Sequence, residues 1–159
     1  MNLTRVISKY FKEQESGIDC SISIVREDGI VLYTNLQKKY RSQSIGALAA
    51  GVWQAATALN STIDITTSDV LDFRLSFDQS DEGVYLLGFN FNSNNYLVCA
   101  LYSETVNPAK LKMNIRNIKT SLVSFLSTYN QKETHTNSDY LFNNITDEEM
   151  DRLFEYGGA

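Results

Sequence analysis

Fifteen consecutive residues in the first half of the chain, Ile45 to Leu59, contain no charged side chain. Apolar residues recur there at the three- and four-residue spacing of a helix, and Ser44 stands before them as a candidate N-cap. A helix that is apolar almost all round is normally buried on more than one side. We therefore expect it to pack on its own domain and also on another protein. The expected core stripe is Ile45, Leu48, Val52, Ala55 with Ala56, and Leu59.

The other faces of this helix are the candidate site for a dimer interface or a partner. Their side chains are small or aromatic, with very few polar groups among them. The candidate residues are Ala47, Ala50, Gly51, Trp53, Gln54 and Ala58.

Strands are predicted on both sides of the helix, two before it and three after it. Their ranges are 18–27, 30–34, 70–78, 84–92 and 96–103. Asp28 and Gly29 predict a tight hairpin between the first two, because both positions tolerate positive φ. Hairpin connections imply a largely antiparallel five-stranded sheet. The second and third strands are separated by the helix, so both are candidates for sheet edges.

Two further helices are expected at the ends of this domain. Apolar residues repeat at helical spacing from Leu3 to Phe11. Asn107 and Pro108 predict the start of the second, with Asn as cap and Pro in the first turn, and its apolar stripe runs to Tyr129. The class is thus α/β of the α+β type, in the order helix-strand-strand-helix-strand-strand-strand-helix.

The C-terminal part differs in charge from the rest. Residues 1–129 hold 12 acidic and 12 basic side chains, whereas residues 130–159 hold 7 acidic and 2 basic. We expect a domain over 1–129, a flexible linker over 130–144 and an acidic amphipathic helix over 145–156. Thr146 and Glu149 have capping-box spacing, and Met150, Leu153 and Phe154 form an apolar stripe. This helix either packs on its own domain or docks on a partner.

The sequence lacks the common catalytic and cofactor motifs. It contains no phosphate-binding glycine loop, no zinc-protease motif and no CxxC, and its one histidine, His135, lies in the polar linker. Cys20 and Cys99 stand alone within apolar strands and are expected to be reduced. The acidic pI of about 4.8 argues against nucleic acid. We expect a cytoplasmic protein, with a cell pole as a candidate location. We also expect that it is not an enzyme and uses no cofactor or metal.

The order of elements and the segment Ile45–Ala56 resemble the roadblock/dynein light chain family, and within it the bacterial MglB group. The Asp28-Gly29 hairpin fits the same pattern, and the segments 111–119 and 145–154 are similar to the last domain helix and the acidic tail of that group. The resemblance implies a homodimer. Its second helices would lie antiparallel, and its third strands would pair across the two-fold axis through Asp72, Arg74 and Ser76.

The resemblance also implies a partner, the GTP form of a small Ras-like GTPase (MglA-like) that governs cell polarity or motility. Dimers of this group accelerate hydrolysis by repositioning the GTPase's own residues, and the tail helix would hold a second surface of the partner. Val52 and Trp53 depart from the usual helix pattern, and Trp53 is expected to alter the GTPase-facing surface. The alternatives are a roadblock scaffold that does not change nucleotide turnover and a small-molecule-sensing α/β module, which would need a cavity with convergent polar groups.

Overall fold

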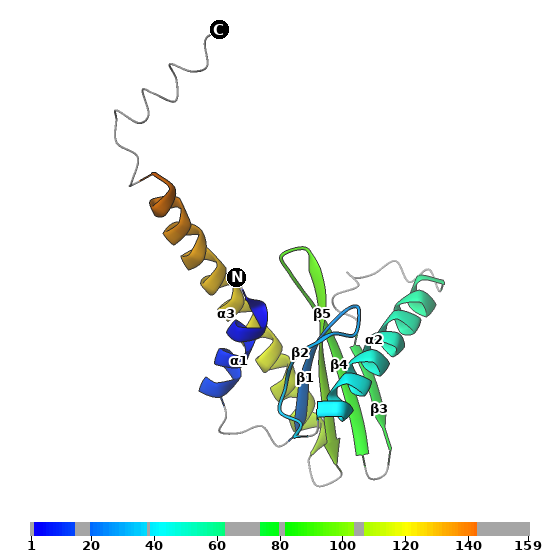
Figure 1. The fold of residues 1–159 in the computed structure, drawn as a ribbon. Helices are drawn as coiled ribbons and strands as arrows, with labels where there is room; N and C mark the ends of the chain where they lie inside the picture. The colour runs from blue at the N-terminus through cyan, green and yellow to red at the C-terminus, as the bar shows by residue number, and fades with distance from the viewer. Residues whose placement is uncertain are drawn as a thin grey trace. The chain divides into compact units, whose positions relative to one another are not determined.

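The computed structural model describes residues 2–14, 20–37, 39–62, 74–79, 82–103 and 107–142. Its helices and strands follow the predicted order (Figure 1). They are α1 (Leu3–Glu13), β1 (Ser21–Arg26), β2 (Val31–Thr34), α2 (Lys39–Thr62), β3 (Arg74–Asp78), β4 (Glu82–Phe91), β5 (Asn94–Ser103) and α3 (Pro108–Phe142). The α+β class and the five-stranded antiparallel sheet are confirmed.

The sheet has the order β2-β1-β5-β4-β3, so β2 and β3 form its edges, as expected. The β1–β2 hairpin turns at Gly29, whose φ of 87° lies in the left-handed region that glycine adopts without strain. Asp28 supports this turn, because its carboxylate accepts hydrogen bonds from Arg26 Nε and from the backbone N–H of Ile30. The bond from Arg26 lowers the pKa of Asp28.

Helices cover both faces of the sheet: α2 lies on one face, and α1 and α3 lie on the other (Figure 1). On the α1 and α3 side, Phe11 stacks on Tyr33 at 4.1 Å between ring centroids, and Arg116 Nε donates to the Tyr85 hydroxyl over 3.0 Å. On the α2 side, Ala49 and Trp53 pack in one core cluster with strand residues. The strand members of that cluster are Val25, Leu86, Leu97 and Cys99.

Helix α2 begins at Lys39, so the expected start at Ile45 and the expected cap at Ser44 are wrong. No glycine or proline lies between Lys39 and Ser44 to prevent an earlier start. Ser42 is buried one turn before Gly46, on the same side of the helix. The buried side of α2 therefore begins before the apolar run that marked the helix in the sequence.

Helix α3 starts at the predicted cap, where Asn107 Oδ1 accepts hydrogen bonds from the backbone N–H groups of Ala109 and Lys110. It continues to Phe142, beyond the expected end at Tyr129. Residues 130–139 lack apolar side chains, which predicted a linker, but they also lack glycine and proline, so nothing in them breaks the helix.

The chain divides into two compact units between Leu126 and Ser127. The first unit, residues 2–126, contains the sheet, α1, α2 and most of α3. The acidic helix expected over 145–156 lies outside the described residues, with Glu149, Met150, Leu153 and Phe154, so it remains a prediction. Asp72 of the expected edge strand also lies outside them. No helix among the described residues combines the length and the apolar character needed to cross a membrane.

Candidate functional site

The side of α2 that faces the sheet is made of small residues and one tryptophan. Gly46, Ala49, Ala50 and Trp53 are buried. A Cβ atom at Gly46 would lie 2.4 Å from the carbonyl oxygen of Gly29, so the helix backbone approaches the β1–β2 turn directly. These contacts place small side chains of α2 in the core.

Leu48, Val52 and Leu59 of α2 point away from the core, which overturns most of the expected core stripe. Ile45 is the exception, because it is partly buried against the core cluster. Leu48 is 68% exposed and Leu59 is 64% exposed. Sequence periodicity could not choose between the two faces because both are apolar. The choice depends on β4, where Gly88 leaves room for the Trp53 indole: a Cβ at Gly88 would lie 2.6 Å from Trp53 Cζ2.

At 3.6 residues per turn, the other residues of α2 fall on two flanks. We call one the apolar flank: Ile45, Leu48, Val52 and Leu59. We call the other the cavity flank: Ala47, Gln54, Ala58 and Ser61. Gln54 Nε2 donates to the carbonyl oxygen of Glu27 at the end of β1 over 3.0 Å, so the cavity flank faces the β1 side of the sheet. The apolar flank therefore faces the side that ends in β3.

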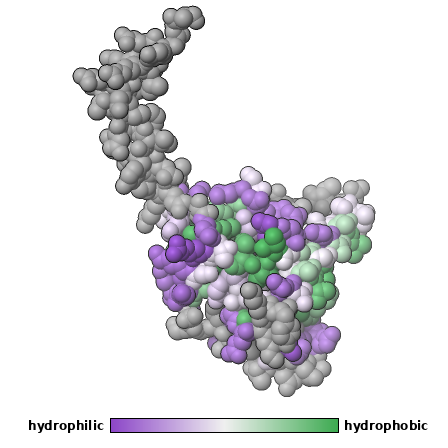
Figure 2. All heavy atoms as spheres, viewed as in Figure 1, coloured by the Kyte–Doolittle hydropathy of each residue, from purple (hydrophilic) through white to green (hydrophobic). Residues whose placement is uncertain are grey.

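The apolar flank and β3 together expose large apolar side chains. Phe77 of β3 is 49% exposed and lies opposite Val84 of β4, on the face that α2 covers. Figure 2 shows hydrophobic residues gathered over the right-hand side of the molecule, where α2 lies. Exposed apolar groups concentrated in one region are typical of a surface that another protein covers.

On the opposite face, β3 is tied to α3 by a polar cluster around Asp78. The carboxylate accepts hydrogen bonds from Lys112 Nζ over 2.8 Å, from Ser76 Oγ over 2.8 Å and from the Tyr102 hydroxyl. These bonds, the one from Lys112 first, lower the pKa of Asp78 to about 2. Gly83 makes room for the Tyr102 ring, since a Cβ there would lie 2.2 Å from Tyr102 Cζ. The cluster holds the short edge strand in place.

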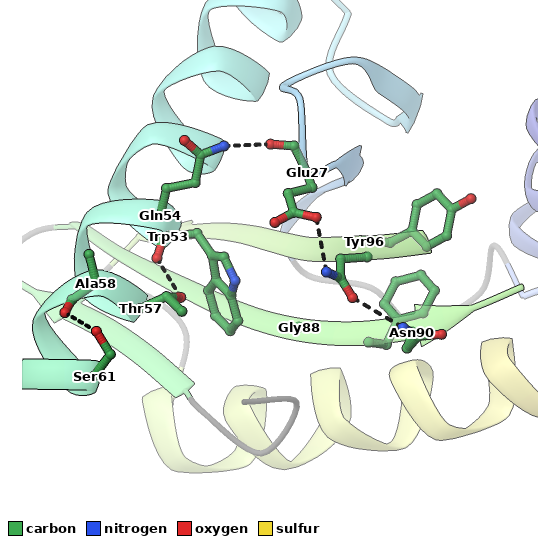
Figure 3. A pocket seen from close by; sticks show the side chains of 11 residues that line it. Glu27, Trp53, Gln54, Thr57, Ala58, Ser61, Gly88, Asn90 and Tyr96 are labelled. Atoms are coloured by element: carbon green, nitrogen blue, oxygen red, sulfur yellow. Dashed lines mark hydrogen bonds between the residues drawn. The ribbon is translucent and has the colours of Figure 1, made fainter. Parts of the chain in front are cut away.

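A cavity of about 530 Å³ lies between the cavity flank of α2 and the sheet. Figure 3 shows Trp53 and Gln54 reaching into it from the helix, with Gly88 beneath the indole. Polar side chains from three strand ends form a hydrogen-bonded row at its rim. Asn90 Nδ2 donates to Asn95 Oδ1 over 3.1 Å, and Asn95 Nδ2 donates to Glu27 Oε2 over 2.9 Å.

The predicted site residues divide into three groups in the structure. Ala50 and Trp53 are buried against the sheet, and Trp53 is only 7% exposed, so it cannot alter an outer surface as expected. The exposed candidates are Ala47, Gly51, Gln54 and Ala58 on α2 and Arg74 and Ser76 on β3. The others lie outside the described residues: Asp72, Glu149, Met150, Leu153 and Phe154.

Sequence reasoning missed Leu48, Val52, Leu59 and Phe77 as surface residues, and Glu27, Asn90 and Asn95 as cavity residues. The exposure of the aliphatic residues could have been predicted, because a helix with two apolar faces can bury the face that carries its small residues. No sequence pattern marks the cavity residues, since they meet only when two hairpin ends come together in the fold.

The buried cysteine, Cys99, is not a candidate nucleophile. Cys99 is buried, and this burial raises the pKa of its thiol to about 12, so the nucleophilic thiolate is essentially absent at neutral pH. Cys20 is partly buried, and neither cysteine forms a disulfide.

No protein-family model matches the sequence, and comparison with curated proteins found no significant match. Solved structures do match. The MglB gliding protein of Thermus thermophilus superposes with a TM-score of 0.60 at 14% identity, covering 80% of this chain and 92% of that one. Myxococcus xanthus MglB gives a TM-score of 0.58 at 12% identity, covering 80% of this chain and 89% of that one. A Roadblock/LC7 domain from Streptomyces avermitilis gives a TM-score of 0.58 at 13% identity, covering 82% of this chain and 99% of that one. The chain has the roadblock fold.

These matches each cover about four-fifths of the chain, but the roadblock fold does not by itself assign a function. At these identities the likeness is one of architecture alone. The chain's own residues must therefore supply any functional argument, and on this roadblock domain those are the apolar flank, the β3 edge and the cavity.

Proposed function

We propose that this roadblock protein is a homodimeric regulator of a small Ras-like GTPase. The observation that carries the proposal is the exposed apolar flank of α2 beside the exposed edge strand β3. The similarity in fold to MglB structures and the sequence resemblance to the MglB group support the choice of partner class.

Dimerisation through this surface satisfies two physical demands at once. An edge strand presents unpaired backbone N–H and C=O groups, which a second copy of β3 pairs across a two-fold axis. The same symmetry brings two apolar flanks together and buries Leu48, Val52 and Leu59. Full burial of such side chains stabilises by about 1.5–3 kcal/mol each, and these start partly covered, so each contributes less.

The GTPase is proposed to bind the outward face of α2 in the dimer. Ala47, Gly51 and Ala58 are exposed there and are small enough for close approach of a partner's backbone. The protein would act by holding the GTPase's own catalytic groups in place, which is an electrostatic positioning role. The acidic tail helix, with Met150, Leu153 and Phe154, is proposed to hold a second surface of the same partner.

The test is phosphate release by the Ras-like GTPase encoded in the same genome, titrated with this protein. We expect acceleration that saturates once the GTPase is fully bound. Ala47→Arg should abolish the acceleration while the protein remains a dimer, because a charge would enter the contact with the GTPase. A titration in which no complex forms would contradict the proposal. A complex without acceleration would contradict the activating role and favour the scaffold.

A further inference from the structure

The cavity beside α2 has the dimensions and polarity of a small-molecule site. Its volume of about 530 Å³ falls within the range of roughly 300–1,000 Å³ that ligand pockets occupy. Trp53 lines it, and the polar row of Asn90, Asn95 and Glu27 forms its rim. Such a combination of an aromatic wall and a few converging polar groups is typical of ligand sites.

The charge and hydrogen bonding of the lining define the kind of ligand. Glu27 is the one charged side chain among the described lining residues. Its Oε2 accepts from Asn95, and its Oε1 accepts no hydrogen bond from the described residues. The hydroxyls of Thr57 and Ser61 donate to backbone carbonyls of α2, over 2.9 Å and 2.7 Å. The lining therefore carries a net negative charge on a carboxylate acceptor, which favours a ligand that brings N–H donors.

Trp53 adds a preference for a flat, positively charged group. Gly88 and the sheet hold the indole in one position, so contact with it orders no additional side chain. Tryptophan is the aromatic residue that attracts cations most strongly, and it also stacks on other rings. We propose that this cavity binds a small planar organic cation, an aromatic amine or amidine, whose ring lies against Trp53 and whose N–H groups donate to Glu27.

This site does not compete with the proposed dimer. The cavity lies on one flank of α2, and the dimer surface is proposed on the other. The inference stands independently of the proposed dimer, because it rests on residues that the dimer surface does not use. Ala58 is the one lining residue that the cavity shares with the proposed GTPase surface.

The structure also supplies the reporter for a test. Trp53 is the only tryptophan in the chain, so its fluorescence reports on this cavity alone. Benzamidine is a suitable probe, with neutral benzamide and anionic benzoate as analogues of nearly the same shape. We expect benzamidine to change the fluorescence saturably at roughly millimolar concentration and to raise the melting temperature. Benzamide should bind at least about tenfold more weakly, because its contact with Glu27 lacks charge assistance, and benzoate should not bind.

Two variants test the role assigned to Glu27. Glu27→Gln should weaken benzamidine binding by about tenfold or more, while Glu82→Gln, at the far end of β4, should leave it unchanged. Should Glu27→Gln fail to fold by circular dichroism, Ser61→Lys serves instead: it places a cation at the exposed edge of the cavity and should weaken binding in the same way. No saturable change up to about 10 mM benzamidine, equal binding of all three probes, or an unchanged affinity in the folded variants would each overturn the proposal.

Discussion

The two flanks of α2 show how one helix separates two kinds of surface. On the cavity flank, Gln54 bonds to the β1–β2 hairpin and the polar groups are tied into a network. On the apolar flank, Leu48 and Leu59 are largely exposed. The first arrangement is complete within one chain, apart from a ligand-sized cavity. The second exposes apolar surface that a partner would cover.

The difference arises from how the helix meets the sheet. Small residues at Gly46, Ala49 and Ala50 let the backbone of α2 approach closely, and Trp53 fills the space over Gly88. Because these residues fill the core, Leu48, Val52 and Leu59 remain on the outside. This arrangement suits a protein that uses its second helix for assembly.

The largest effect is expected from charge on the apolar flank. Leu48→Arg should weaken the homodimer by about 100-fold or more, because an unpaired charge would be buried in the interface. Ala47→Arg changes the preceding residue, which lies on the cavity flank, and should leave the dimer intact. Sedimentation velocity would measure both, with circular dichroism as a check on folding. Equal behaviour of the two variants would remove the distinction between the flanks.

A smaller effect is expected from the glycine beneath Trp53. Gly88→Ala should reduce the free energy of unfolding by roughly 1–3 kcal/mol, because the new Cβ would push the indole off the sheet. Thermal unfolding should show a drop of several degrees in Tm. An unchanged Tm would mean that Trp53 is not held against β4, and the cavity would then lose its fixed wall.

Gly51→Ala should stabilise the protein, in contrast to Gly88→Ala. Gly51 lies on the outward side of α2, and a Cβ there would meet no atom within 4 Å. Alanine in the middle of a helix is favoured over glycine by roughly 0.5–1 kcal/mol, so the variant should unfold at a slightly higher temperature. A lower Tm would indicate that a second copy of the chain already lies against Gly51, and would move the dimer surface from the apolar flank to the outward face.

The smallest effect is expected at the polar cluster that anchors β3 beside the apolar flank. The pKa of Asp78 is lowered from 3.8 to about 2, so its stabilisation is present above about pH 4 and is lost as the pH falls toward 2. Asp78→Asn should lower Tm slightly at neutral pH, and the gap to the unchanged protein should close across that window. Glu82→Gln is the control. A gap that persists at pH 2 would show that the charge of Asp78 does not hold β3.

Much of the fold could be predicted because its signals are local. The Asp28-Gly29 turn and the Asn107 cap depend on backbone demands that few residues satisfy, and strand alternation marked the sheet. The bounds of α2 and α3 were less predictable, since polar stretches without glycine or proline allow either helix or loop.

The candidate site was predictable as a helix but not as a set of residues. Its assignment depended on which apolar face of α2 meets the sheet, and that choice follows from Gly88, a residue 35 positions after Trp53 in the chain. Glu27 and Asn95 meet through the hairpin ends of β1 and β5, a non-local contact without a sequence motif. Sequence periodicity alone could not predict that these groups lie close together.

The most direct test of the central claim is the mass of the protein in solution, measured by light scattering across micromolar concentrations. The account predicts twice the chain mass of 18.0 kDa, and a return to the single-chain mass in Leu48→Arg. A protein that remains at 18.0 kDa at every concentration would contradict it, because the apolar flank and the β3 edge would then be uncovered in the native state.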